Sequence, residues 1–140
     1  MSKRSIDSYI LPATSEAAAG KLEKHFKEIG TRYVFVDNRN YPETQMYVIA
    51  RAVKNIEKGE EHIKPHTHRV DNLMSFIGDN DDLTGLTVEV LVGEERRVLK
   101  SPVSAYIPSG IKHNYRFVKG SGKYINIVLV PGGDYNSVTS

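Results

Sequence analysis

The sequence predicts an all-β protein with one N-terminal helix, built as an antiparallel sandwich or barrel. Three observations predict this class. After Gly30, short runs rich in Val, Ile, Tyr and Phe are separated by clusters of turn residues. These runs do not alternate with helical patterns, which argues against a parallel α/β sheet. The chain has 140 residues and no internal repeat, so the strands are expected to form one domain.

The first 30 residues differ in pattern from the rest. Residues 1–30 are expected to form an arm followed by a helix from about Ser15 to Ile29. Thr14 or Ser15 can cap the start of this helix, its apolar residues fall on one face, and Gly30 can end it.

The remainder is expected to form the barrel, over residues 31–131, followed by a flexible tail over 132–140. Turn-forming Gly, Pro, Asn, Asp and Ser separate the apolar runs. The predicted strands lie near 32–37, 44–54, 66–77, 84–92, 95–100, 103–107, 113–118 and 123–130.

Composition limits the classes of function. The absence of cysteine excludes disulfides, thiol nucleophiles and cysteine-ligated metals. The 19 basic and 17 acidic residues leave a net charge of +2 without a block of like charge, so no nucleic-acid partner is expected. The N-terminus lacks the apolar run of a signal peptide, and no segment approaches the roughly 20 apolar residues of a membrane span. We therefore expect a cytoplasmic protein that does not bind membranes.

Three of the five histidines form a candidate metal site. His66 and His68 are separated by one residue on a predicted strand, so their rings point to the same face. His113 follows a Pro-Ser-Gly turn at the start of another predicted strand, which can lie beside the first in a barrel. Three neutral imidazoles suit one divalent ion of Fe, Zn, Ni, Mn or Cu, and the residue types do not select among them.

The surroundings of these histidines resemble the two motifs of the cupin superfamily. The segment Gly59…His66-Thr67-His68…Gly78 is similar to the first motif, and Pro108-Ser109-Gly110-Ile111-Lys112-His113 is similar to the second. The resemblance covers about residues 45–130. It implies a small, single-domain jelly-roll barrel with a bound metal and a homodimer formed by packing of sheets.

The chain departs from the family pattern at two positions. Asn72 stands where the family has a glutamate, and Phe117 stands where it has an asparagine. Asn72 shares the parity of His66 and His68, so we expect it to be a weak fourth ligand or a hydrogen-bond donor to bound water. Asp71 lies out of phase unless a bulge turns it inward. Such a site keeps a net positive charge, which favours an anionic substrate; the same change is also compatible with weak or lost metal binding.

Other residues are candidates for the wall of a pocket. Tyr115 follows His113 on the same face and could bind substrate or donate a proton. An inward Arg51 would need an anionic partner, and Tyr47 shares its parity, so both are candidate substrate-binding residues together with Asn72. An outward, solvated Arg51 is equally compatible with the sequence. His62, in the loop before the first motif, is a candidate proton donor or an exposed residue.

Two classes of function follow. The first is a metal-dependent enzyme acting on a small, anionic metabolite, either as a dioxygenase or by isomerase- or lyase-type proton transfer. The second is a non-catalytic cupin that binds a small molecule or a metal, as a sensor or carrier. Fold resemblance does not select a reaction.

Overall fold

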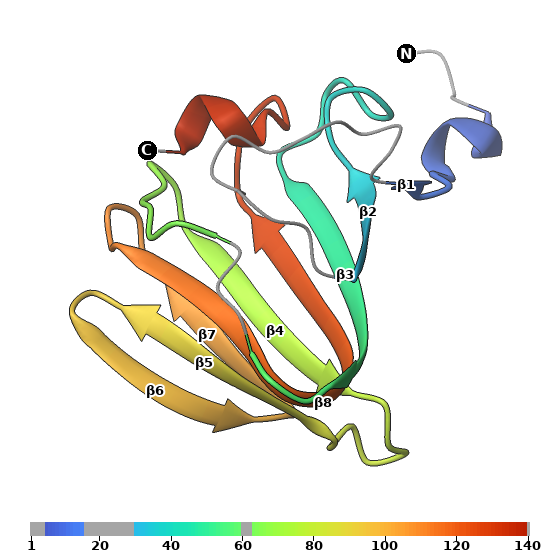
Figure 1. The fold of residues 1–140 in the computed structure, drawn as a ribbon. Helices are drawn as coiled ribbons and strands as arrows, with labels where there is room; N and C mark the ends of the chain where they lie inside the picture. Colours follow the sequence, from blue (N-terminus) through green and yellow to red (C-terminus); the bar gives the residue numbers. More distant parts are fainter. Residues whose placement is uncertain (1–4, 16–29, 60–62, 140) are drawn as a thin grey trace.

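The structure is a computed structural model, and it describes residues 5–15, 30–59 and 63–139 (Figure 1). Every strand pair in these ranges is antiparallel. The elements are η1 (Ile6–Tyr9), β1 (Thr14–Ser15), β2 (Thr31–Val36), β3 (Tyr47–Ile56), β4 (Asn72–Gly78), β5 (Leu86–Val92), β6 (Glu95–Lys100), β7 (Val103–Ile107), β8 (His113–Val128) and η2 (Tyr135–Val138). The all-β prediction is confirmed.

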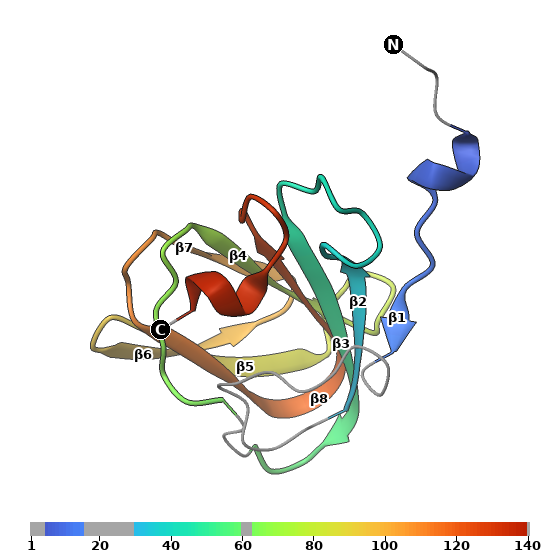
Figure 2. The ribbon, with the colours of Figure 1, turned by 90° about the horizontal axis from the view of Figure 1, so that it is seen from above.

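The long strand β8 joins the two layers of the barrel. Its first part pairs with β5, which pairs with β6. Its second part lies between β3 and β4, and β2 and β7 extend the layer on either side. Figure 2 looks down on one end of the barrel and shows η2 lying over that end.

The core lies between the two layers because alternate residues of the strands point inward. On β4 the pattern places Asn72, Met74 and Phe76 inside, with exposed fractions of 2%, 1% and 0%. Val88 of β5 and Phe117 of β8 meet them from the other layer. At the end of the barrel under η2, polar and aromatic side chains lie beside the aliphatic ones.

The two strands predicted at 113–118 and 123–130 correspond to one continuous strand in the structure, β8, which ends at Val128. The predicted turn at Lys119–Gly122 is instead the bend by which β8 passes from one layer to the other. Gly120 adopts a φ of +101° there, and a Cβ on it would collide with the carbonyl oxygen of Gly85.

The predicted strand at 66–77 begins only at Asn72 in the structure. His66 and His68 form isolated bridges with two different segments, so no continuous ladder forms before Asn72. Apart from Ser15, which pairs in β1, the predicted helix at 15–29 lies outside the described residues. Within the described ranges, no helix has the length and hydropathy needed to cross a bilayer.

Candidate metal centre

The backbone brings the three histidines together. His66 and His113 exchange both main-chain hydrogen bonds, with N···O distances of 3.0 and 2.9 Å. His68 forms a second isolated bridge, to Thr139 near the C-terminus. Since His66 and His68 are separated by one residue in extended chain, their rings share one side, and the bridge places the His113 ring beside them.

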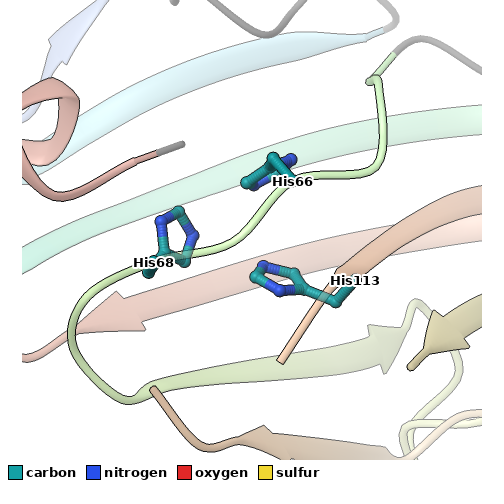
Figure 3. Close-up of side chains that lie close together, drawn as sticks. All are labelled: His66, His68 and His113. Atoms are coloured by element: carbon teal, nitrogen blue, oxygen red, sulfur yellow. The ribbon is translucent and has the colours of Figure 1, made fainter. Parts of the chain in front are cut away.

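The three rings surround one space under η2 (Figure 3). Their centroids lie 4.7 Å apart for His66 and His113 and 4.9 Å apart for each pair that includes His68. One nitrogen of each ring lies within 4.8 Å of the others. All three residues are buried, with exposed fractions of 6%, 2% and 2% for His66, His68 and His113.

Hydrogen bonds at Nδ1 fix the orientation of each ring. Nδ1 of His66 lies 2.7 Å from the carbonyl oxygen of Lys64, and Nδ1 of His113 lies 2.9 Å from that of Ile111. A carbonyl only accepts, so both Nδ1 atoms carry the proton. Nδ1 of His68 lies 3.0 Å from the hydroxyl of Thr139, which itself donates to the carbonyl of Tyr135 at 2.8 Å. That hydroxyl must therefore accept from His68, and in all three rings Nε2 is the unprotonated nitrogen that carries the lone pair.

Burial favours the neutral form of His68 and His113. Burial, with a smaller contribution from the neighbouring His66 and His113, lowers the pKa of His68 to about 3. Burial also lowers the pKa of His113. The neutral ring with a free lone pair is the form that binds a metal.

Nε2 of His68 shows that the donor set fits a cation. It is buried and has no hydrogen-bond partner among the described residues. An unsatisfied polar atom in the interior destabilises the fold by about 1–3 kcal/mol. A divalent cation bound by the three Nε2 atoms would remove that penalty, and Nδ1–H bonds to outer acceptors are typical of metal-bound histidines. The three-histidine group therefore suggests a metal-binding site.

The histidines line a small cavity at this end of the barrel. Its space is about 20 Å³, enough for about one water molecule or ion. The wall is mostly aromatic and apolar, with two asparagines. It consists of Tyr47, Ile49, Ile63, His66, His68, Met74, His113, Asn114, Tyr115, Tyr124, Asn126 and Tyr135.

Comparison with known proteins finds similarity in structure and not in sequence. No family model matches the chain, and no curated protein matches it significantly. Oxalate decarboxylase from Bacillus subtilis matches 83% of this chain and 28% of its own, with a TM-score of 0.57 and 16% identity. An RmlC-like cupin from Shewanella frigidimarina matches 83% of this chain and 90% of its own, with a TM-score of 0.52 and 16% identity. KdgF from Halomonas sp. matches 77% of this chain and 83% of its own, with a TM-score of 0.51 and 14% identity.

The chain has the cupin fold. The two cupin-like motifs of the sequence meet at the bridge between His66 and His113, which is the place where the candidate ligands converge.

Asn72 points into this cupin barrel, as its parity predicts, but it does not line the cavity. Its Nδ2 donates to Oδ1 of Asn126 at 3.1 Å, and Asn126 lies in the cavity wall. The Oδ1 of Asn72 is buried and has no hydrogen-bond partner among the described residues. Asn72 therefore supports the wall through Asn126.

Two of the predicted tyrosines line the cavity. Tyr115 is 3% exposed, and its ring lies 4.1 Å from that of Tyr124. Tyr47 is 3% exposed and accepts a long hydrogen bond from Arg32, at 3.4 Å. Burial raises the pKa of Tyr47 to about 12, so it stays a phenol at neutral pH.

Two other residues considered for the site, Arg51 and Asp71, lie outside the cavity wall. Arg51 points inward and is 0% exposed, but it is not part of the cavity wall. Asp71 is turned away from the histidines and accepts hydrogen bonds from the Tyr106 hydroxyl and the Ser109 amide at 2.5 and 2.8 Å. His62 lies outside the described residues.

The sequence analysis missed Tyr135, which belongs to the segment expected to be a flexible tail. Tyr135 is 6% exposed, and its hydroxyl lies 3.3 Å from Nε2 of His66. Its ring packs 4.8 Å from Tyr47 and 5.0 Å from His68. The Gly132-Gly133 pair before it is the one local signal, because both glycines have positive φ and turn the chain back over the barrel.

Proposed function

We propose that this chain is a metal-dependent cupin enzyme that acts on a small, anionic metabolite, with His66, His68 and His113 as the metal ligands. The observation that carries the proposal is the protonation pattern of the three rings. Each Nδ1 is hydrogen-bonded to an outer acceptor and carries the ring proton, so each Nε2 is left as the unprotonated nitrogen of a buried ring in one group.

The charge of the site supports an anionic substrate. The three ligands are neutral imidazoles, and no carboxylate of the described residues joins their group. A divalent ion bound by these three imidazoles alone keeps its full charge. The buried guanidinium groups of Arg32 and Arg51 add positive charge to the same barrel. A carboxylate or a similar anion compensates such a site best.

The residues of the wall would orient the substrate and exclude water. Tyr115 and Asn126 offer a hydroxyl and an amide at the cavity, and Met74 and Ile49 give it apolar surface. Since the cavity holds about one water molecule, binding of a substrate would require the segment 131–139 to move away from the histidines.

A bound divalent ion would supply a Lewis acid, and a redox-active one could also activate dioxygen. Two reaction classes therefore remain: oxygenation, and proton transfer next to a carboxylate or carbonyl group. Tyr115, which lies in the cavity wall, is the first candidate for the proton donor or acceptor. His62, predicted from the sequence for the same role, is the second candidate.

A second candidate is a non-catalytic cupin that stores or senses a metal or small ligand. The small size of the cavity favours it, and so does the position of Asp71, which faces away from the histidines. An enzyme requires a group near the metal that moves a proton, and a binding module does not.

The first experiment is metal analysis of protein purified without an affinity tag or added metal. We expect about one divalent ion per chain, and its identity divides oxygenation from proton transfer. Thermal unfolding of the loaded protein is then measured with small carboxylates, including oxalate because of the similarity in fold to oxalate decarboxylase. Stabilising ligands are tested for turnover and for oxygen uptake. Ligand binding without turnover would select the binding module, and absence of bound metal would contradict the metal-dependent enzyme.

A further inference from the structure

The C-terminal segment places one hydroxyl group directly at the histidines. The hydroxyl of Tyr135 lies 3.3 Å from Nε2 of His66. Nδ1 of His66 carries its proton toward Lys64, so Nε2 accepts a hydrogen bond from the tyrosine. Among the described side chains, Tyr135 carries the hydroxyl that contacts an Nε2 atom of the three histidines.

The segment that carries Tyr135 is fastened to the barrel on both sides. Before it, the amide of Gly132 donates to the carbonyl of Thr44 at 2.9 Å. After it, the amide of Arg69 donates to the carbonyl of Val138 at 2.8 Å, and the Arg69 guanidinium donates to the carbonyl of Ser137. These bonds hold the ring of Tyr135 in the mouth of the cavity.

From this geometry we propose that Tyr135 supplies the fourth protein ligand, through its phenolic oxygen. The inference rests on the three-histidine metal site proposed above. Consider two ligand atoms that each lie about 2.1 Å from the same metal ion. They are about 3.0 Å apart when the ligand–metal–ligand angle is a right angle, and about 3.4 Å apart when that angle is tetrahedral. The observed 3.3 Å between Tyr135 and His66 falls between these values.

This assignment gives the site a fourth, negatively charged ligand although position 72 carries no carboxylate. Asn72 is engaged with Asn126 and does not line the cavity. Tyr135 instead contacts this group of rings from η2, near the C-terminus. Coordination as phenolate releases one proton to solvent and adds one negative charge to the site. Because the ligand sits on the segment that covers the cavity, its departure would open both the cavity and a coordination position.

The test uses Cu(II), which binds imidazole sites most tightly among the divalent first-row metals. The full-length protein is loaded with one equivalent of Cu(II) in wild-type form and as Tyr135→Phe. Tyr47→Phe and Tyr115→Phe are matched controls, since both rings line the same cavity. Electron paramagnetic resonance reports the imidazole nitrogens on copper. Visible absorption and resonance Raman spectra report a phenolate on copper.

We expect a phenolate-to-copper absorption band with enhanced tyrosine ring vibrations in the wild type and in both controls. Tyr135→Phe should lose the band and bind copper at least tenfold more weakly, while imidazole hyperfine splitting remains. A wild type that shows imidazole splitting without the band, or a Tyr135→Phe variant that keeps the band, overturns the inference and leaves the three-histidine site standing. A copper-loaded wild type without imidazole hyperfine splitting would overturn the proposed metal site and this inference with it.

Discussion

His66 and His113 are locked together by their main chains, each donating its amide proton to the carbonyl of the other at 3.0 and 2.9 Å. This bridge joins two segments that are far apart in sequence. It fixes the distance between the two rings before any metal is present, so a metal ion would bind a preformed site. Because the bridge uses main-chain atoms alone, it survives replacement of either side chain.

The first prediction follows from that bridge. His66→Ala and His113→Ala should each lower the metal content per chain at least tenfold, while circular dichroism remains that of a β-rich protein. The reason is that each change removes one ligand and leaves the main-chain pairing intact. Metal content is measured by mass spectrometry after dialysis against trace metal. His25→Ala, a histidine not counted among the ligands, is the control, and equal metal in all variants would rule out the site.

Much of the fold was predictable because it depends on local patterns. The alternation in β4 and the turn residues between β5, β6 and β7 are properties of neighbouring residues, and the structure bears them out. The two histidine motifs were recognisable for the same reason. The predicted strands at 95–100 and 103–107 coincide with β6 and β7.

What could not be predicted depends on contacts between distant segments. Tyr135 carries no motif, and only the three-dimensional structure places it beside His66, 69 positions away in sequence. The sequence could not predict whether Arg51 points inward. Val48 and Ala50, which alternate with the inward residues of β3, are also apolar, so polarity does not distinguish the two faces of this strand. The partner of Asn72 is Asn126, on a strand whose register with β4 no sequence pattern reveals.

A second prediction concerns the bend of β8. Gly120→Ala should reduce the free energy of unfolding by about 2–4 kcal/mol, because it combines a positive φ with a collision against the Gly85 carbonyl. Urea unfolding measures this difference. Gly93→Ala is the matched control, since Gly93 has a φ of +62° and open space around it. It should lose only about 1–2 kcal/mol. Equal losses would show that the close approach of β8 to Gly85 is not a constraint.

A third prediction concerns the homodimer that the cupin resemblance implies. Val48, Ile127, Leu73 and Tyr106 are successive partners across β3, β8, β4 and β7. They form an apolar row on the outer face of the sheet, and a second copy of the chain could cover it. We expect twice the chain mass by light scattering after size-exclusion chromatography.

The matched variants for this prediction carry one new lysine each. Leu73→Lys should shift the protein toward the monomer, because it places a charge in the centre of the apolar row. Val98→Lys changes an apolar residue on β6 that is 56% exposed and lies in the other layer, so it should remain dimeric. A wild type with the mass of one chain would contradict the dimer.

The fourth prediction tests the position at which this chain departs from the cupin pattern. Asn72→Glu should lower the melting temperature of the metal-free protein, because it buries a carboxylate and removes the amide donor to Asn126. Divalent metal should bind more tightly to this variant, since the new carboxylate can approach the ion and offset its charge. The difference in melting temperature with and without Zn(II) should therefore be larger than in wild type. Asn72→Gln, which adds length without charge, is the control. A smaller metal-induced shift for Asn72→Glu than for Asn72→Gln would mean that the side chain at 72 cannot reach the ion.

The last prediction concerns acid. The pKa of His68 is 6.5 in the unfolded chain and about 3 in the folded one, chiefly because of burial. Between these values the unfolded state binds a proton that the folded state does not, so the free energy of unfolding falls as the pH drops through this window. One such proton contributes at most about 1.4 kcal/mol per pH unit. The lowered pKa of His113 acts in the same direction.

Urea unfolding of metal-free protein between pH 7 and pH 4 measures this slope. His68→Gln should unfold with a smaller pH dependence than wild type, because it removes the group whose protonation differs between the two states. The carboxylates contribute mainly at the acid end of the range, so the difference between wild type and variant should be largest near pH 5–6. Saturating Zn(II) should steepen the dependence in wild type, since protons and metal compete for the same nitrogen. An identical slope for wild type and His68→Gln would show that His68 accepts a proton equally well in the folded and unfolded chains.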